Sequence, residues 1–357
     1  MTQQTSYLYL RGLRQVDHTV FCVSDGQKTY RDPRSRRPVP YSSGQQVKRS
    51  ILDELTSILE EPRAPITFNF TLSNKAGKTE FGNGEPWSPC DPDYTDQLIG
   101  GWMRAGKEGA PVKRRSPLSI SAMRPLHPSL SETSEENVTF DRSDHPEQHR
   151  IRVTNELGHE ISQEEFLASL QAANRNATMR LWIPGDKIGP RTTGLFVYDV
   201  AIDLRALFSV SLNTFEPELA PDVVVRLKNG GWQESADKTR IICPKEKREK
   251  IIPALAQSLL YWRVTSNQSR TYSPQNTLAF AFGQNANRLG AAIRAELTEE
   301  SEYRRAAPVL DDTLDGVNVY TALTAKAYIP EVVASKDALD RAEEDLTTAL
   351  REFDYDV

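Results

Sequence analysis

The sequence predicts an α+β fold, because segments with strand patterning alternate with segments of helical patterning along its 357 residues. Residues 6–24 are dominated by aromatic and β-branched side chains, which is typical of a strand. Residues 194–204 have the strongest strand pattern of the chain. Residues 44–59 and 245–260 instead repeat apolar side chains at helical spacing. A chain of this length is expected to form one large elaborated domain or two domains.

The first helix is predicted to begin at Ser42 or Ser43, because serine hydroxyl groups suit the N-cap position. Val47, Ile51 and Leu55 then follow at helical spacing and give the helix one apolar stripe. Strand, loop and helix in this order match the opening half of an RRM-like β-α-β unit.

Other elements follow from the same patterns. Residues 66–72 alternate and are predicted to form the second strand of this sheet, and residues 277–282 form a further apolar strand. Residues 161–170 are predicted to form a short helix, whereas residues 127–160 are polar and lack an apolar stripe. The segment from Ser335 onward is predicted to be an amphipathic helix that packs on its own domain or docks on a neighbour.

Charge is distributed unevenly along the chain. The net charge is -5, but residues 1–50 carry a balance of +6 and residues 296–357 a balance of -10. One end of the chain is therefore suited to phosphates, and an acidic surface could meet the basic surface of a second copy. Cys22, Cys90 and Cys243 are odd in number and far apart, which predicts reduced thiols in a cytoplasmic protein. No segment has the apolar length of a membrane span, so no membrane partner is expected.

The start of the first helix is the main candidate for a binding site. A helix start offers free backbone N–H groups and the positive end of the dipole, which favour phosphate. The loop before it contains Pro33, Pro38 and Pro40, which are expected to prevent regular strand pairing. The candidate phosphate contacts around this helix start are the side chains of Arg34, Arg36, Arg37, Ser43, Gln45, Gln46, Lys48 and Arg49. Since no nucleotide-type glycine motif accompanies them, a polymeric phosphate chain is predicted; the alternative is a solvated charged face.

The run Ser43-Gly44-Gln45-Gln46-Val47-Lys48-Arg49, behind this basic proline-rich loop, resembles the first helix of the Cas-seven family. Members of that family are RAMP-type subunits that coat CRISPR RNA in Cascade-like complexes. The family pattern of Ser, then Gln, then Lys-Arg before an apolar helix is present here in full. The resemblance implies an RRM/ferredoxin-like palm with large insertions, which form fingers and a thumb-like hairpin.

A second stretch is similar to the DevR-like branch of the same family. In that branch an aspartate and a short apolar helix precede Arg-Arg-Ser-Pro-Leu and an alternating strand, here residues 96–103 and 114–121. The resemblance makes Arg114 and Arg115 phosphate-contact candidates, and the alternative is a solvated basic turn. It also places Arg270 in a loop that lies against the RNA backbone, although Ser and Asn replace the usual glycines there.

The resemblance implies three segments. Residues 1–72 would form the first half of the palm with the RNA-contacting helix, residues 73–193 the finger and thumb-like insertions, and residues 194–357 the second half of the palm with a helical tail. The implied function is the self-polymerising, crRNA-binding backbone of a type I interference complex in antiviral defence. The implied partners are a CRISPR guide RNA, the target DNA paired to it, head-to-tail copies of the chain and other Cascade subunits.

Catalytic motifs are absent from the sequence, so no enzymatic activity, cofactor or metal is predicted. His145 and His149 flank Pro146, which disfavours the helix that would bring both rings together, and a surface loop is expected. The alternative function comes from type III relatives of the family, which cut target RNA with a loop aspartate. Asp25 or Asp32 could take that place, but Asp32 in Arg-Asp-Pro is expected to be a turn or ion-pair residue. A third alternative is a protein scaffold that binds no nucleic acid.

Overall fold

The computed structural model divides into two compact units, residues 1–132 with 192–357 and residues 133–191. Both helices and antiparallel sheets are present, which confirms the mixed α and β class. The residues that the structure describes are 6–21, 27–33, 36–75, 78–82, 84–104, 111–135, 137–141, 151–176, 180–183, 190–264, 272–298 and 305–355.

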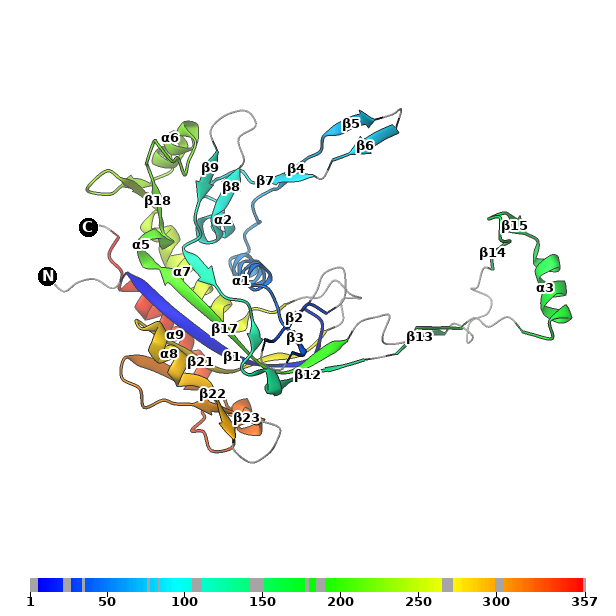
Figure 1. The fold of residues 1–357 in the computed structure, drawn as a ribbon. Helices are drawn as coiled ribbons and strands as arrows, with labels where there is room; N and C mark the ends of the chain where they lie inside the picture. The colour runs from blue at the N-terminus through cyan, green and yellow to red at the C-terminus, as the bar shows by residue number, and fades with distance from the viewer. Residues whose placement is uncertain are drawn as a thin grey trace. The chain divides into compact units, whose positions relative to one another are not determined.

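A central sheet organises the larger unit (Figure 1). Among the described residues seven strands belong to it, and five follow one another in the order β10-β17-β1-β21-β24. β11 and β12 pair with β17 as well. The strands are β1 (Tyr7–Thr19), β10 (Leu118–Ile120), β11 (Arg124–Pro125), β12 (Ser131–Ser134), β17 (Arg191–Asp203), β21 (Gln275–Gly283) and β24 (Val317–Thr321).

Two connections in this sheet join strands that are not neighbours, and each passes one intervening strand. β17 is antiparallel to both β1 and β10, so β1 and β10 run in the same direction with β17 between them. Helix α1 (Gly44–Ile58) lies between β1 and β10 in the chain. Helix α7 (Lys245–Tyr261) likewise connects β17 to β21, with antiparallel β1 between those two strands. Two β-α-β units are therefore interleaved in one antiparallel sheet.

Three helices cover one face of the sheet. α1, α7 and α9 (Ala338–Arg351) lie side by side there (Figure 1). Their apolar stripes share one core with the sheet side chains that point toward them, such as Leu10 and Phe280. The stripe predicted for the first helix is confirmed, because Val47, Ile51 and Leu55 are fully buried. The tail helix packs on its own unit, as one of the two sequence-based alternatives predicted.

The opposite face of the sheet is partly covered by a second, smaller core. Leu13, Ala279 and Ala281 of the sheet pack there against Leu289 and Ala325. The elements around this core are α8 (Ala286–Ala292), β22 (Ile293–Thr298), β23 (Arg305–Leu310) and η3 (Leu323–Ala327). They follow directly on β21 and β24 in the chain, which is why only that half of the face is covered.

Residues 66–72 correct the sequence-based prediction. They do not enter the central sheet, where β10 occupies the expected place. Instead β4 (Thr67–Asn69) pairs with β7 (Glu85–Trp87), and β5 (Leu72–Lys75) pairs with β6 (Lys78–Phe81), which together form an extended ribbon (Figure 1). The alternating pattern correctly predicted a strand, but its partners are residues 78–87 of the same ribbon and not the strands of the central sheet.

The proline-rich segment is a short hairpin rather than an irregular loop. β2 (Thr29–Arg31) pairs with β3 (Pro38–Pro40). Backbone hydrogen bonds join Asp32 to Arg37 and Tyr41 to Lys28 on either side of this pairing. In this register the two prolines of β3 fall at positions whose backbone nitrogen faces away from β2, so their missing N–H groups remove no ladder bond.

Shorter elements complete the larger unit. The short helix predicted around Asp96 is α2 (Thr95–Gly100), and the alternating strand predicted after Arg115 is β10. The basic residues before it belong to β9 (Val112–Arg114), which pairs with β8 (Trp102–Arg104). Between β17 and α7 lie α5 (Leu204–Leu207), β18 (Ser209–Ser211), α6 (Pro221–Asn229), β19 (Gln233–Glu234) and β20 (Arg240–Ile242). The 3-10 turn η1 (Pro128–Leu130) precedes β12. No helix in the described part of the chain has both the length and the apolar character to cross a bilayer.

The smaller unit has little core of its own. β13 (Val138–Asp141) pairs with β16 (Arg180–Ile183), and β14 (Val153–Thr154) pairs with β15 (Glu160–Ile161). Helix α3 (Gln163–Ala172) confirms the predicted short helix but buries none of its residues. His145 and His149 lie outside the described residues, so the prediction for them stays a prediction.

Candidate nucleic-acid interface

Helix α1 begins at a tightly packed point of the larger unit. The Ser43 side chain accepts a hydrogen bond from the Gln46 amide at 3.4 Å, which confirms Ser43 as the N-cap. Ser42 is fully buried and exchanges two 2.9 Å backbone hydrogen bonds with Met123. A Cβ on Gly44 would lie 2.6 Å from the Ile120 carbonyl oxygen, so only glycine allows this approach. The helix start is therefore fixed against the strands that follow β9.

Polar groups remain exposed around this fixed point. Gln45 and Arg49 face solvent, and the Arg49 side chain is 74% exposed with its Nε 3.6 Å from Asp53 Oδ2. Arg36 and Arg37 are exposed in the turn that joins β2 to β3. Gln46 is half-buried, and its Oε1 accepts a hydrogen bond from the Ser42 hydroxyl at 3.0 Å. Exposed cations thus lie both on the first turns of α1 and on the hairpin before it.

Lys48 is more constrained than its neighbours. Its half-buried ammonium donates a 2.5 Å hydrogen bond to the carbonyl oxygen of Gly100, at the carboxyl end of α2. Burial lowers the pKa of Lys48 to about 8, and the nearby charge of Arg114 contributes to this shift. The Lys48 charge is therefore present at neutral pH and is lost just above it.

Arg114 corrects the sequence-based prediction of a phosphate contact. Its side chain is 4% exposed and lies 5.2 Å from the centre of the Trp102 ring. The guanidinium donates hydrogen bonds to the carbonyl oxygens of Leu98, Ala206 and Ser209. Burial lowers its pKa to about 10, partly offset by Glu218 at 4.0 Å. Arg114 therefore joins three backbone segments inside the unit, and no strand of nucleic acid can reach it there.

Arg115 occupies the opposite position. It directly follows the buried Arg114 at the end of β9 and is exposed. Successive side chains of an extended segment point to opposite sides, which separates the two arginines. Arg115 therefore stays a candidate contact. Arg270 and Asp25 lie outside the described residues.

The structure adds Arg124, which sequence reasoning missed. β11, which carries Arg124, contacts β3 of the basic hairpin, and Arg124 is 47% exposed. Its Nη2 lies 4.0 Å from Asp199 Oδ2, while Arg11 on β1 donates to Asp199 Oδ1 at 2.7 Å. Burial raises the pKa of Tyr30, Asp32 raises it further, and the charge of Arg124 opposes both. Arg124 thus lies beside the hairpin although more than 80 residues separate it from β3 in the sequence, and no local signal could reveal this.

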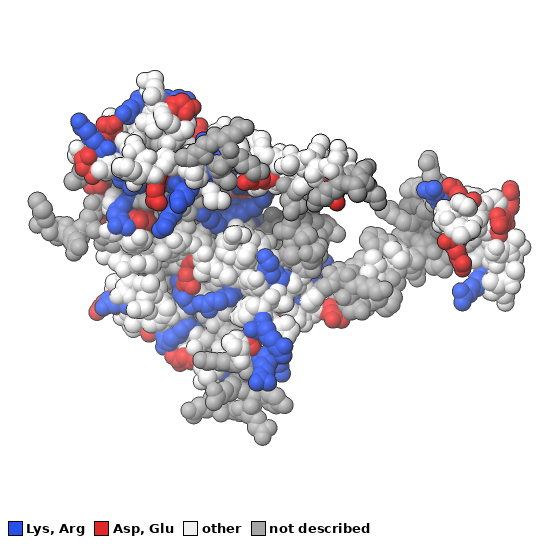
Figure 2. Space-filling model, turned by 45° about the horizontal axis from the view of Figure 1, so that its top comes forward, with Lys and Arg blue, Asp and Glu red and all other residues white. Residues whose placement is uncertain are grey.

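On the face drawn in Figure 2, charge lies in separate groups and not in one continuous patch. Figure 2 shows Lys and Arg side chains in several separate groups on one face, with Asp and Glu among them. This agrees with the net charge of -5 and with a binding surface confined to part of the molecule. Among the described residues, no group of three or more His, Cys, Asp and Glu side chains could hold a metal ion. The described cysteines, Cys90 and Cys243, are free and buried.

Comparisons with known proteins complete the description. No family model and no curated protein sequence matches the chain. Among solved structures it is similar to a chain of a CRISPR RNA-guided surveillance complex in a pre-nicking state, with 9% identity and a TM-score of 0.44 over 97% of this chain and 89% of that one. It is also similar to a chain of a CRISPR RNA-guided surveillance complex, with 10% identity and a TM-score of 0.38 over 95% of this chain and 80% of that one.

Replacing Arg114 with Ala is expected to lower the free energy of unfolding by about 3 kcal/mol, because the carbonyl oxygens of Leu98 and Ala206 would lose the Arg114 donor, while that of Ser209 would keep Arg240. Arg115→Ala is the matched control, since it removes the same side chain from an exposed neighbouring position. It should change the free energy of unfolding by less than about 0.5 kcal/mol. Urea denaturation followed by circular dichroism measures both values. Equal stability of the two variants would mean that Arg114 is a surface residue after all.

Proposed function

We propose that the chain is the crRNA-binding, self-polymerising backbone subunit of a type I CRISPR interference complex. The observation that carries this proposal is the start of α1. There, a Ser-Gln-Lys-Arg pattern like that of the Cas-seven family lies behind a basic hairpin, with exposed cations on both elements. A guide RNA would cross this surface and be held there for pairing with target DNA.

The fold supports the same proposal. With α1 and α7 as crossover helices, the strand order β10-β17-β1-β21 is that of a split β-α-β, ferredoxin-like sheet. We infer that this sheet is an RRM-like palm. The β4–β7 ribbon would then correspond to a finger, and residues 133–191 would contain the thumb-like hairpin.

The contacts proposed for the RNA are sequence-independent. Arg36, Arg37 and Arg49 would bind phosphates directly, with Gln45 and the amides of the first turn of α1 as further donors. Lys48, Arg115, Arg124 and Arg270 would extend this contact surface, and Ser43 and Gln46 would hold the helix start in place. Contacts of this kind fix the position of the strand, while base pairing with the target supplies specificity.

Self-assembly follows from the distribution of charge. Exposed acidic side chains on α9, such as Asp340 and Glu344, belong to the acidic end of the chain. A basic surface near the amino terminus would meet this acidic surface on the next copy, which gives a head-to-tail assembly. We propose that the rotation between copies does not close a ring, so that the assembly is an open filament. Other Cascade subunits would bind at the ends of such a filament.

We further propose that the chain is not a nuclease. Asp32 belongs to the turn between β2 and β3: its amide donates to the Arg37 carbonyl oxygen at 3.0 Å, and its carbonyl oxygen accepts from Arg36 at 2.8 Å. This supports a turn residue rather than a catalytic group. The assembled complex, incubated with complementary RNA and a divalent metal, should leave that RNA intact. Regularly spaced cuts that vanish in Asp25→Ala or Asp32→Ala would instead favour the type III alternative.

The binding surface is tested by replacing Lys48 and Arg49 with Ala. The affinity for guide RNA should fall about equally for unrelated spacers, because phosphates and not bases are bound. The slope of log affinity against log salt should flatten by roughly 0.7 for each phosphate of a single strand that is no longer neutralised. Filter binding at several salt concentrations measures both effects.

The matched control for this experiment is Lys238→Ala with Lys250→Ala, which removes two exposed lysines from other elements. An unchanged slope in the Lys48 and Arg49 variant would remove these residues from the interface. A protein that carries no RNA after expression with a CRISPR array, as judged by its ultraviolet absorbance ratio, would instead favour a scaffold without nucleic acid.

Lys48 should also make RNA binding sensitive to pH. Because its pKa in the free protein is about 8, the ammonium is charged below that pH and loses its proton above it. If the bound phosphate keeps Lys48 protonated, the affinity should fall by up to about tenfold between pH 7 and pH 9. Oligocytidylate is a suitable ligand, since its bases do not titrate in this range. Lys48→Arg should keep the affinity and lose the pH dependence, and an equal decline in that variant would assign it to another group.

A further inference from the structure

A cavity of about 480 Å³ lies at one end of the central sheet. β1 and β21 form part of its wall together with the end of α7, the residues after β24 and the start of α9. Its side chains include Arg14, Arg263 and Lys336, the rings of Tyr261 and Tyr272, and the amide of Asn276. None of the described residues that line it is a carboxylate.

Arg14 lies at the inner wall of this cavity, where Glu54 acts on its charge from outside the lining and no lining residue that the structure describes is a carboxylate. It is 1% exposed, and its guanidinium lies 4.3 Å from the centre of the Trp262 ring. Nε donates to Thr277 Oγ1 and Nη2 to the carbonyl oxygen of Leu260, both at 3.3 Å. Nη1 is buried without a hydrogen-bond partner in the described part of the chain. A buried cation held by neutral groups favours an anion nearby.

Burial has a measurable consequence for Arg14. It lowers the pKa of this arginine to about 10, and the charge of Arg263 acts in the same direction. Arg263 and Lys336 line the same cavity nearer to solvent, so positive charge accumulates there in a chain whose net charge is negative. Such a concentration of like charge costs free energy until an anion offsets it.

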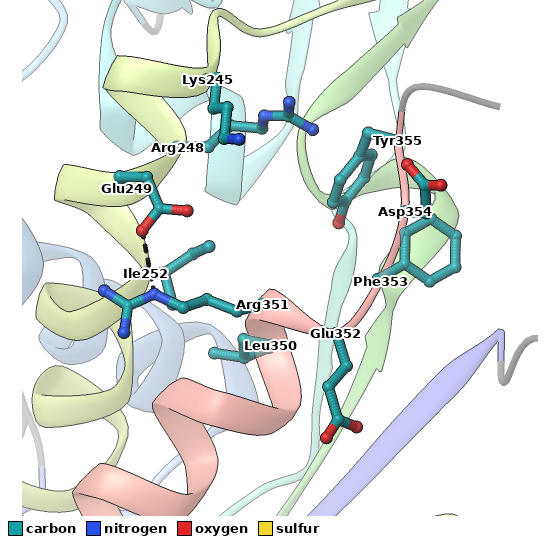
Figure 3. Close-up of a pocket in the computed structure, with 10 residues that line it drawn as sticks. All are labelled: Lys245, Arg248, Glu249, Ile252, Leu350, Arg351, Glu352, Phe353, Asp354 and Tyr355. Atoms are coloured by element: carbon teal, nitrogen blue, oxygen red, sulfur yellow. Dashed lines mark hydrogen bonds and ion pairs between the residues drawn. The ribbon is translucent and has the colours of Figure 1, made fainter.

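A second cavity of about 210 Å³ shows the opposite arrangement (Figure 3). Lys245, Arg248 and Arg351 line it together with three carboxylates. Arg351 of α9 and Glu249 of α7 face one another as an ion pair of 2.9 Å. Charge in this second cavity is compensated by the protein itself. The cavity at Arg14 has no such compensation among its described lining residues.

We propose that the cavity at Arg14 binds a phosphate-bearing nucleotide. Its phosphate would lie toward Arg14, Arg263 and Lys336, and its base would stack on a tyrosine ring, of which Tyr272 is 72% exposed. The volume falls within the range of small-molecule sites. The nucleotide is either a free mononucleotide or one unit of an RNA strand. In the second case the inference rests on the proposed function.

The position of the cavity is compatible with both kinds of ligand, a free mononucleotide and one unit of an RNA strand. In the sheet, Arg14 pairs with Phe196 of β17 and Thr277 of β21, while Arg124 of the predicted interface pairs with Val197, next to Phe196. The cavity and Arg124 therefore lie near the same end of the sheet but on opposite faces, because Phe196 and Val197 are successive residues of β17. A strand that passes around this end of the sheet could place one nucleotide in the cavity.

The test compares ligands that differ by one chemical group. Isothermal titration calorimetry measures AMP, adenosine and octaadenylate against protein freed of nucleic acid. The test variant is Arg263→Glu with Lys336→Glu, and the matched control is Lys238→Glu with Lys250→Glu, which makes the same change of charge on exposed residues outside the cavity. None of the four residues is buried, so both variants are expected to fold, and thermal melting checks this.

Two results would support the proposal and separate its sources. The cavity is a site for free nucleotides if two conditions hold. AMP binds at least about tenfold more tightly than adenosine, and the affinity for AMP falls at least about tenfold in the test variant but not in the control. The cavity is instead a site for one unit of an RNA strand if AMP does not bind and the affinity for octaadenylate falls in the test variant but not in the control.

The proposal is overturned if neither ligand distinguishes the test variant from the matched control, or if neither ligand binds at all. Failure of the proposed function would be seen in a different variant, the one in which Lys48 and Arg49 are replaced with Ala. Octaadenylate would then bind that variant as tightly as the unaltered protein.

Discussion

The antiparallel ladder between β1 and β17 holds the larger unit together, and its other elements are placed relative to this ladder. It pairs Tyr7 with Asp203 and continues to Val16 and Gly194, so it joins two segments that are far apart in the sequence. Gly12 lies opposite Tyr198, whose ring fills the space that a Cβ at Gly12 would need. The Tyr198 hydroxyl then donates to the Leu259 carbonyl oxygen of α7 at 2.6 Å. One residue thus fixes the register of the two central strands and the position of a covering helix.

Burial divides the cations of this chain into two kinds. Arg14 and Arg114 lie inside the larger unit, where carbonyl groups and aromatic rings hold them, whereas Arg36 and Arg49 face solvent. Arg114 stabilises packing because its guanidinium satisfies several buried acceptors at once, whereas Arg14 also lines the cavity that we propose to hold a phosphate. The second kind is available to phosphates at the surface. Lys48 lies between these extremes, and its half-buried position brings its pKa close to neutral pH.

The candidate interface shows how far local sequence signals reach. The N-cap at Ser43 and the exposure of Gln45 and Arg49 follow from the helical spacing of residues 44–59, and the structure agrees. The contribution of Arg124 does not follow from it, because β11 reaches the hairpin through tertiary contacts, namely its pairing with β17 and the backbone hydrogen bonds between Met123 and Ser42. The proline-rich segment was expected to be irregular, since the sequence does not reveal that both prolines of β3 fall between ladder bonds.

Periodicity in the sequence was enough to identify the longest strands, β1, β17 and β21, and the longest helices, α1, α7 and α9. It indicates which side of an element is buried, whatever that side packs against. The stripes of α1 and α9 and the length of β17 were predictable for this reason. The partners of these elements depended on tertiary contacts. Such contacts paired residues 67–69 with 85–87 instead of the central sheet, and they buried Arg114 while leaving Arg115 exposed. These outcomes depend on residues far apart in the chain, whose interaction free energies no local pattern records.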